Sequence, residues 1–310
     1  MLGLILLLQA LSVAVSGPRT SPEYLPLQVA AAEGEFARQG LSVVLKTTRG
    51  EVGAAEALAQ GQVDLAATSL EAMLRFGSRP TVPVPRVVFG LTAASARPAS
   101  VAKLAGLKIG LSAPGAPEHT WLLGILEAAG VNPAHVQIVS LGSRGLKAAL
   151  EAAEVAAGMV AEPAATLMLD GGGFAMLADL RSPDGVARAV GGPTVSAAVF
   201  ARSDGAVSDA DLVAFARALL AAQERIRTAP AAEIAKRLPP AVTGLAGEFE
   251  IRLAAAREGY LADGRVTPDQ LRRTIELILA HQPLPAALTL PRPEAMLHLE
   301  PLGRALTSSR

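Results

Sequence analysis

The chain has 310 residues, of which 51% are hydrophobic and 18% charged, with 28 basic and 28 acidic side chains. This composition excludes a disordered chain, and the length is enough for two modest domains with buried cores. A formal charge of zero provides no basic surface for nucleic acid or an anionic membrane, so we expect no nucleic-acid partner. The absence of cysteine excludes disulfides, iron–sulfur clusters, thiolate metal sites and cysteine nucleophiles.

The histidines offer no alternative metal site. There are four of them, far apart and without ligand-like spacing: His119, His135, His281 and His298. We therefore expect neither a metal nor a cofactor.

The N-terminal residues 2–8 form a dense apolar run, LGLILLL, which is too short to span a bilayer. The run resembles the apolar region of a secretory signal peptide, although no basic segment precedes it. The alternatives are the remnant of a longer signal and a buried strand. We interpret Met1–Gln9 as a signal-peptide remnant and Ala10–Gly17 as the start of the fold, which predicts a periplasmic or otherwise extracytoplasmic protein.

Strand-like and helix-like patterns alternate from residue 11 onward. The predicted strands are 11–16, 42–46, 63–67, 86–93, 107–111, 136–140, 155–160 and 195–201. The predicted helices between them are 22–38, 51–60, 69–76, 117–129, 144–153 and 163–169. Alternating strands and helices predict an α/β fold with a mainly parallel sheet and helices on both faces.

The chain beyond residue 207 is predicted to be helical. The expected helices are 208–228, 230–237, 246–262 and 267–280, and the proline-rich tail from Pro283 is expected to lie along the surface.

Helix-start signals recur where a strand gives way to a helix. Cap residues, prolines and early acids occur at Ser21-Pro22-Glu23, Thr68-Ser69-Leu70-Glu71, Ala116-Pro117-Glu118 and Glu162-Pro163. All four junctions follow the carboxyl ends of strands, the edge at which open α/β sheets bind ligands.

A faint internal repeat suggests two lobes of similar design. Residues 57–69 (ALAQGQVDLAATS) and 149–161 (ALEAAEVAAGMVA) both predict a helix end, a turn and a buried strand. Gly61 and Asp64 of the first copy correspond to Ala153 and Ala156 of the second.

Several segments, in order, resemble the nitrate/sulfonate/taurine-type (NMT1/THI5-like) solute-binding proteins of ABC transporters. The segments are YLPLQVAAAEGEFARQGLSVVL (24–45), EALAQGQVDLAATS (56–69), LAGLKIGLSAPGAPEHTWLLGILEAAGVNPAHVQIVSLGS (104–143), AEPAATLML (161–169) and PTVSAAVFARSD (193–204). The resemblance covers residues 11–205, and their order and spacing are more specific than any single motif.

The resemblance implies a two-lobed type II periplasmic-binding fold, with each lobe a mainly parallel sheet flanked by helices. One lobe would comprise 10–92 plus 196–310 and the other 95–192, with a hinge of two crossings near 91–95 and 193–197. It also implies a monomer that closes on a small organic molecule or oxyanion and delivers it to a membrane permease of an ABC importer.

The loop after the first strand supplies candidate ligand contacts in the first lobe. Ser16, Gly17 and Thr20 offer hydroxyls and backbone N–H groups, and Arg19 can pair with a carboxylate or sulfonate. Tyr24 can stack on a ligand. The alternatives are that Ser21 only caps a helix, Arg19 is solvated and Tyr24 packs between helix and hinge.

Thr68 and Ser69 end a strand and are candidates both for helix capping and for ligand contact. In the second lobe, the matching loop provides Ser112, Gly115, His119 and Thr120, where Gly115 permits close approach of a ligand to the backbone. A structural role for His119 is the alternative.

Two glutamates bear on the ligand. Glu118 already supplies negative charge to a helix N-terminus, which weakens the case for nitrate or a sulfonate. Glu162 is a candidate acceptor for a ligand amine or hydroxyl, with helix capping or a contact to the hinge as the favoured alternative.

Enzymes of the same fold are the main competing interpretation. Thiamine-pyrimidine synthases use a cysteine-rich iron motif that this chain lacks, whereas menaquinone-pathway lyases use few polar groups and stay open as an alternative. A ligand-sensing protein that contacts a membrane receptor is the third possibility. The absence of a tight acid/base or nucleophile–base motif favours a binding protein without enzymatic activity.

Overall fold

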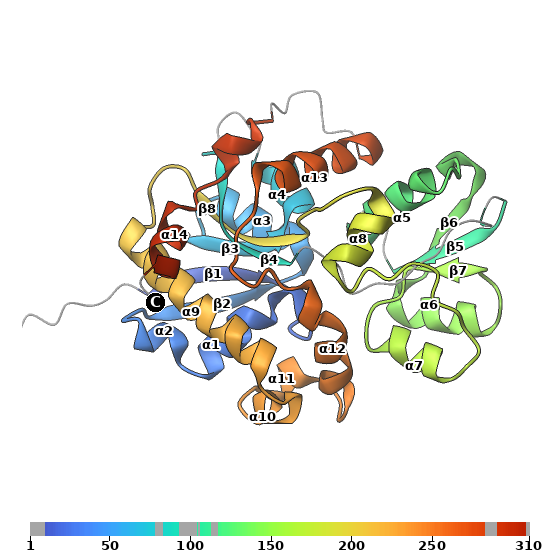
Figure 1. The fold of residues 1–310 in the computed structure, drawn as a ribbon, viewed down its shortest axis with the longest axis horizontal. Helices are drawn as coiled ribbons and strands as arrows, with labels where there is room; N and C mark the ends of the chain where they lie inside the picture. The colour runs from blue at the N-terminus through green and yellow to red at the C-terminus, as the bar shows by residue number, and fades with distance from the viewer. Residues whose placement is uncertain are drawn as a thin grey trace, which may run out of the picture.

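The computed structural model of the protein describes residues 10–77, 83–92, 104, 106–112, 117–282 and 290–307. The predicted signal-peptide remnant, residues 1–9, and the candidate ligand residue Gly115 lie outside the described residues. The chain folds into two α/β lobes that lie side by side (Figure 1). Within the described residues, none of the helices has the length and apolarity that a membrane crossing requires.

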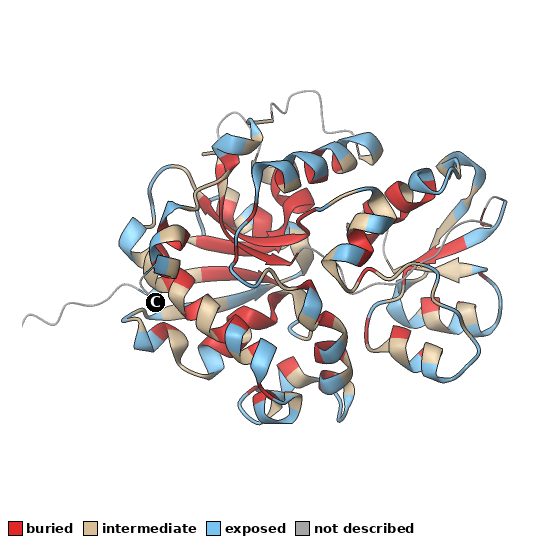
Figure 2. Cartoon of the chain, viewed as in Figure 1, coloured by how far each residue is buried: buried red, intermediate tan, exposed pale blue. Residues whose placement is uncertain are grey.

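The larger lobe is built on a five-stranded sheet with the order β2-β1-β3-β8-β4. Its strands are β1 (Leu11–Ser16), β2 (Val43–Thr48), β3 (Leu65–Ser69), β4 (Pro85–Thr92) and β8 (Ala197–Arg202). β1 is parallel to β2 and β3, whereas β8 is antiparallel to both β3 and β4. Alternate side chains point to opposite faces, so Val13 and Val15 join one hydrophobic cluster and Ala14 joins the other. Both faces are therefore buried along β1, β3, β4 and β8, whereas the edge strand β2 is partly exposed (Figure 2).

Helices cover both faces of this sheet. One face carries α1 (Leu25–Ala32), α2 (Glu35–Arg38), α9 (Asp209–Thr228) and α14 (Glu300–Thr307). The other carries α3 (Gly50–Ala59), α4 (Leu70–Gly77) and α13 (Pro268–His281). Shorter elements complete the lobe: η1 (Pro22–Tyr24), α10 (Ala231–Ala235), α11 (Pro240–Thr243), α12 (Glu248–Ala256), η3 (Arg257–Gly259) and η4 (Pro293–Met296).

The two long C-terminal helices begin where their sequences supply caps. The Ser208 hydroxyl accepts a hydrogen bond from the backbone N–H of Asp211 at the start of α9. At the start of α13, Thr267 and Gln270 form a reciprocal capping box, with Pro268 at the first helical position. Each arrangement satisfies N–H groups that have no partner inside the helix.

The smaller lobe contains a parallel three-stranded sheet with the order β6-β5-β7. Its strands are β5 (Lys108–Leu111), β6 (Gln137–Ser140) and β7 (Ala157–Gly158). Its helices are α5 (Pro117–Ala128), η2 (Pro133–His135), α6 (Gly142–Glu151), α7 (Ala164–Asp170) and α8 (Pro183–Val190). A Cβ atom on Gly110 of β5 would lie 2.3 Å from Leu146 Cδ1, so glycine at this position lets α6 pack closely on the sheet.

The chain returns from the smaller lobe to the larger one beside the end of β4. The Ser196 backbone N–H donates to the Thr92 carbonyl oxygen over 2.9 Å, and the Ser196 carbonyl accepts from the Leu70 N–H over 3.1 Å. The crossing expected at 193–197 includes Ser196, and its role as a hinge stays a prediction. The other expected crossing, 91–95, lies outside the described residues beyond Thr92.

Helix α13 packs against both lobes. Ile275 and Ile278 belong to a hydrophobic cluster of the larger lobe, whereas Leu277 packs against the core of the smaller one. A Cβ atom on Gly124 of α5 would lie 2.5 Å from Leu277 Cδ1, so α5 and α13 approach closely. The segment at 267–280, assigned from the sequence to one lobe, therefore also contacts the other.

All eight predicted strands form, and the α/β architecture with parallel-rich sheets flanked by helices is confirmed, with β8 as the antiparallel strand of the larger sheet. Two predicted extents are wrong. The strand at 155–160 shortens to β7, which pairs with β5 only at Ile109 and Gly110. The helix at 22–38 is divided into η1, α1 and α2, with Gly34 at a φ of 76° between the last two.

The predicted surface course of the C-terminal tail is wrong for residues 290–307. Helix α14 packs on α9, and its Leu302 and Ala305 are fully buried. These two residues are three positions apart and therefore share one helical face. The proline-rich composition near Pro283 made this short apolar face hard to recognise in the sequence. Helix α8 was also not predicted.

Candidate functional site

A cleft of about 470 Å³ lies between the two lobes. Its walls in the larger lobe are the segments that follow β1, β2 and β3, and its walls in the smaller lobe follow β5 and β6. Four of these strand ends lead directly into a helix or a short turn before one. The cleft therefore occupies the edge where open parallel sheets bind ligands.

Glu51, in the first turn of α3, accepts several hydrogen bonds in this cleft. Its carboxylate accepts bonds from Tyr24 Oη at 2.8 and 2.7 Å, from Thr68 Oγ1 at 2.9 Å and from the Ser69 backbone N–H at 2.7 Å. Burial is the largest cause that raises the pKa of Glu51, and these hydrogen bonds oppose it. Burial also raises the pKa of the Tyr24 phenol, with the nearby Glu51 charge adding to it.

Glu71, in the first turn of α4, connects the two lobes. Its Oε2 atom accepts a hydrogen bond from Thr120 Oγ1 of α5, and its Oε1 atom accepts one from Arg75 Nη2 at 3.3 Å. Gln282 Nε2, at the end of α13, donates to the same Thr120 oxygen. Burial raises the pKa of Glu71, and the contacts from Thr120 and Arg75 oppose that rise.

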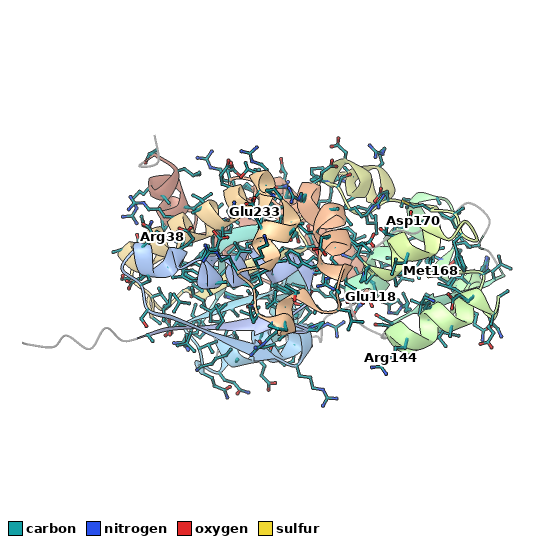
Figure 3. All side chains as sticks on the ribbon, turned by 90° about the horizontal axis from the view of Figure 1, so that it is seen from below. Arg38, Glu118, Arg144, Met168, Asp170 and Glu233 are labelled. Carbon is teal, nitrogen blue, oxygen red and sulfur yellow. The ribbon has the colours of Figure 1, made fainter. Side chains whose placement is uncertain are left out.

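Glu118 is the third carboxylate of the cleft and belongs to the smaller lobe. It is in the first turn of α5, is 1% exposed and accepts a hydrogen bond from the Ser112 hydroxyl. Figure 3 shows Glu118 between the two lobes. The cleft therefore has a buried carboxyl group on each side.

Four of the residues predicted from the sequence line this cleft: Gly17, Tyr24, Ser69 and Ser112. A Cβ atom on Gly17 would lie 2.6 Å from the Thr48 carbonyl oxygen, so a side chain at this position would collide with β2. The structure thus brings together predicted residues from both lobes around one space.

Other predicted residues of the larger lobe support the cleft walls or lie away from them. The Ser16 hydroxyl donates to the Ala67 carbonyl, and Thr68 donates to Glu51. Arg19 is exposed, and its Nε donates to Thr47 Oγ1 at 2.9 Å. Thr20 is partly exposed and does not line the cleft.

His119, Thr120 and Glu162, the other predicted residues of the smaller lobe that the structure describes, do not line this cleft. Thr120 makes the hydrogen bonds between the lobes. His119, the residue before it, is partly buried, and this burial is the main cause that lowers its pKa. The Glu162 carboxylate accepts from the Thr166 backbone N–H at 3.1 Å and lies 3.9 Å from Arg181 Nη1. Glu162 thus serves the start of α7, the structural role favoured from the sequence.

Sequence reasoning missed several cleft residues, notably Arg49, Glu51, Glu71 and Arg75. Glu71 was read only as an early acid of a helix. The junction Arg49-Gly50-Glu51 follows the predicted strand 42–46 and begins the next predicted helix, so its position after a strand was the available signal.

A larger hollow of about 760 Å³ lies entirely within the smaller lobe, beside β7. Apolar side chains dominate its walls, including Met168, Leu169 and Phe174, and Figure 3 shows Met168 in this lobe. We take the cleft between the lobes as the candidate site because polar groups from both lobes converge there.

The chemistry available in the cleft is acceptance and donation of hydrogen bonds. No histidine is among the described residues that line it, so they provide no hydroxyl–imidazole pair for nucleophilic catalysis. Within the described part of the chain, no cluster of three or more histidine, aspartate or glutamate residues forms a candidate metal site.

The paired lobes and the cleft at their strand ends define a type II periplasmic-binding fold. The chain belongs to the NMT1/THI5-like family, whose model matches residues 21–232. Among curated protein sequences, no significant match is found.

Solved structures with the same fold cover nearly the whole chain. A protein of Bordetella bronchiseptica RB50 is 23% identical, with a TM-score of 0.74 over 97% of this chain and 98% of its own. The periplasmic aliphatic sulphonate-binding protein SsuA of Escherichia coli is 16% identical, with a TM-score of 0.73 over 90% and 95%. The alkanesulfonate-binding protein SsuA of Xanthomonas axonopodis pv. citri, bound to MOPS, is 17% identical, with a TM-score of 0.66 over 94% and 98%.

Proposed function

We propose that this protein is the solute-binding component of an ABC importer. It holds one small molecule between its lobes and passes that molecule, chemically unchanged, to a membrane permease. It acts outside the cytoplasm as a monomer and requires no cofactor. Family membership and the binding proteins that share its fold support this function.

The observation that carries the proposal is the convergence of polar groups from both lobes on one cleft. Ser69 and Glu71 lie on one side, and Ser112 and Glu118 lie on the other. The cleft volume, about 470 Å³, falls within the range of about 300–1,000 Å³ that is typical of small-molecule sites. A molecule that contacts both sides favours the closed arrangement by its additional contacts.

Two exposed valines allow a matched test of this site. Val52 lines the cleft and is 46% exposed, whereas Val44 on β2 is 45% exposed and does not line it. We expect Val52→Trp to obstruct the cleft without disturbing the core, and Val44→Trp to leave binding unchanged. The assay is retention of small molecules from a metabolite extract, by dialysis and mass spectrometry, with thermal stabilisation as a second readout.

The same assay separates a binding protein from an enzyme. Retained molecules should be recovered with their original mass, and loaded protein should stimulate ATP hydrolysis by its permease complex in vesicles. Appearance of a new product, abolished by Val52→Trp, would replace the importer proposal with an enzymatic one.

A further inference from the structure

Three of the α-helices that begin at the cleft have a glutamate as their second residue. The pairs are Gly50-Glu51 in α3, Leu70-Glu71 in α4 and Pro117-Glu118 in α5. The N-terminus of a helix carries partial positive charge and unpaired N–H groups, which make it a natural place for an anionic ligand. Here the protein's own carboxylates occupy that environment at all three helices.

Hydrogen-bond donors of the site are bonded to the carboxylate of Glu51. The Tyr24 hydroxyl, the Thr68 hydroxyl and the Ser69 N–H all donate to its carboxylate. Two of these donors end β3 and the third, Tyr24, ends η1, and all three are of the kind that would hold an anion's oxygen atoms. Because they are already engaged by Glu51, an incoming anion would have to displace a buried carboxylate to reach them.

The balance of charge along the cleft is acidic on both sides. Four glutamates line it (Glu23, Glu51, Glu71 and Glu118), against two arginines (Arg49 and Arg75). Arg75 donates to Glu71, and Arg49 is exposed to solvent. The charges of Glu51 and Glu118 are among the causes that raise the pKa of Glu71, although burial is the largest.

From this arrangement we infer that the cleft binds an organic cation: an amine or amidine whose N–H groups face Glu71 of one lobe and Glu118 of the other. This inference rests on the proposed function and specifies its ligand class. Glu71 and Glu118 line the cleft from opposite lobes and disfavour each other's charge, and a cationic donor placed between them offsets that repulsion. The same carboxylates repel sulfonates, carboxylates and nitrate, so the ligand differs in charge from those that the sulfonate-binding relatives are named for.

The test uses pairs of probes with the same carbon skeleton and opposite charge. The intact chain is dialysed against an equimolar mixture of benzamidine and benzenesulfonate, butylamine and butanesulfonate, and benzylamine and phenylmethanesulfonate, and retained compounds are quantified by mass spectrometry. We expect a member of the cationic set to be retained most strongly. Its affinity should fall about tenfold or more in Glu118→Gln and in Glu71→Gln, because each removes a charged acceptor.

Glu224→Gln serves as the matched control, since Glu224 is an exposed residue of α9 outside the cleft that pairs with Arg227. It should leave retention unchanged. Preferential retention of a sulfonate, blocked by Val52→Trp, would overturn the cation inference while leaving the proposed binding function in place. Retention of no compound, from these probes or from a metabolite extract, would overturn both.

Discussion

Thr120 of the smaller lobe donates a hydrogen bond to Glu71 of the larger lobe, with 2.9 Å between Oγ1 and Oε2. The same hydroxyl oxygen accepts a hydrogen bond from Gln282 Nε2, also at 2.9 Å. Thr120 is 2% exposed, so this connection between the lobes is shielded from water. One hydroxyl thus joins α4, α5 and the end of α13.

Thr120→Val should lower the free energy of unfolding by about 1–3 kcal/mol, because it removes the hydroxyl and leaves Glu71 and Gln282 short of a partner. Thr120→Ser retains the hydroxyl and should lose distinctly less. Urea unfolding followed by circular dichroism measures both variants. Equal losses would show that the hydroxyl makes no contribution.

Glu51→Gln should alter how stability depends on pH. Burial raises the pKa of Glu51 in the folded protein, so the folded state binds this proton more tightly than the unfolded state. The contribution of Glu51 to the free energy of unfolding is therefore fully present below the unfolded pKa and is lost as pH rises through the folded pKa. The glutamine variant bears no such proton, so its stability relative to wild type should improve as pH rises through that window.

Urea titrations between pH 4.5 and pH 7.5 would measure this difference. Glu233→Gln is a suitable control because Glu233 lies on α10, is more than half exposed and does not line the cleft. A constant difference between wild type and Glu51→Gln at all pH values would contradict the expected proton linkage.

Ala153→Gly should stabilise the protein by about 0.5–1 kcal/mol, because alanine is strained in the left-handed region and glycine is not. Ala153 has a φ of 55°, and Gly61 has a φ of 70° at the corresponding turn of the internal repeat. Ala152→Gly is the control, since its φ of −82° suits alanine and glycine there should be neutral or destabilising. A loss of stability in Ala153→Gly would refute the strain at this turn.

Leu302→Ala should lower the free energy of unfolding by about 2–5 kcal/mol, the usual cost of emptying a core position. Leu302 is fully buried where α14 packs on α9, whereas Leu245 is 73% exposed. Leu245→Ala should change stability by less than about 0.5 kcal/mol. Similar small effects in both variants would mean that α14 contributes little to the core.

The strands could be predicted because buried β-branched and aliphatic runs identify them without knowledge of their partners. The Leu11–Ser16 strand forms as predicted because its alternation places Val13 and Val15 in one core and Ala14 in another. The position of the cleft followed from the order of strands and helices, since carboxyl ends of parallel strands meet at one edge.

The acidic character of the site could not be predicted from the sequence. It depends on the burial of its glutamates, and no local sequence pattern indicates that burial. Glu71 has the sequence context of an ordinary exposed acid near a helix start, yet it is 5% exposed because α5 of the other lobe covers it. Glu51 is likewise placed among Tyr24, Thr68 and Ser69 by pairing between strands distant in sequence. Glu118 was the exception, because its effect on an anionic ligand follows from helix electrostatics alone.

The side chains of α13 enter two hydrophobic cores, and this has a thermodynamic consequence. If the core of either lobe unfolded, α13 would lose apolar contacts there. Apolar surface of the core in the other lobe would then be exposed to water. The lobes should accordingly melt in one cooperative transition, even though each has its own sheet. Trp121 is the only tryptophan of the chain and is buried in the smaller lobe, so its fluorescence alone should report the unfolding of the entire molecule.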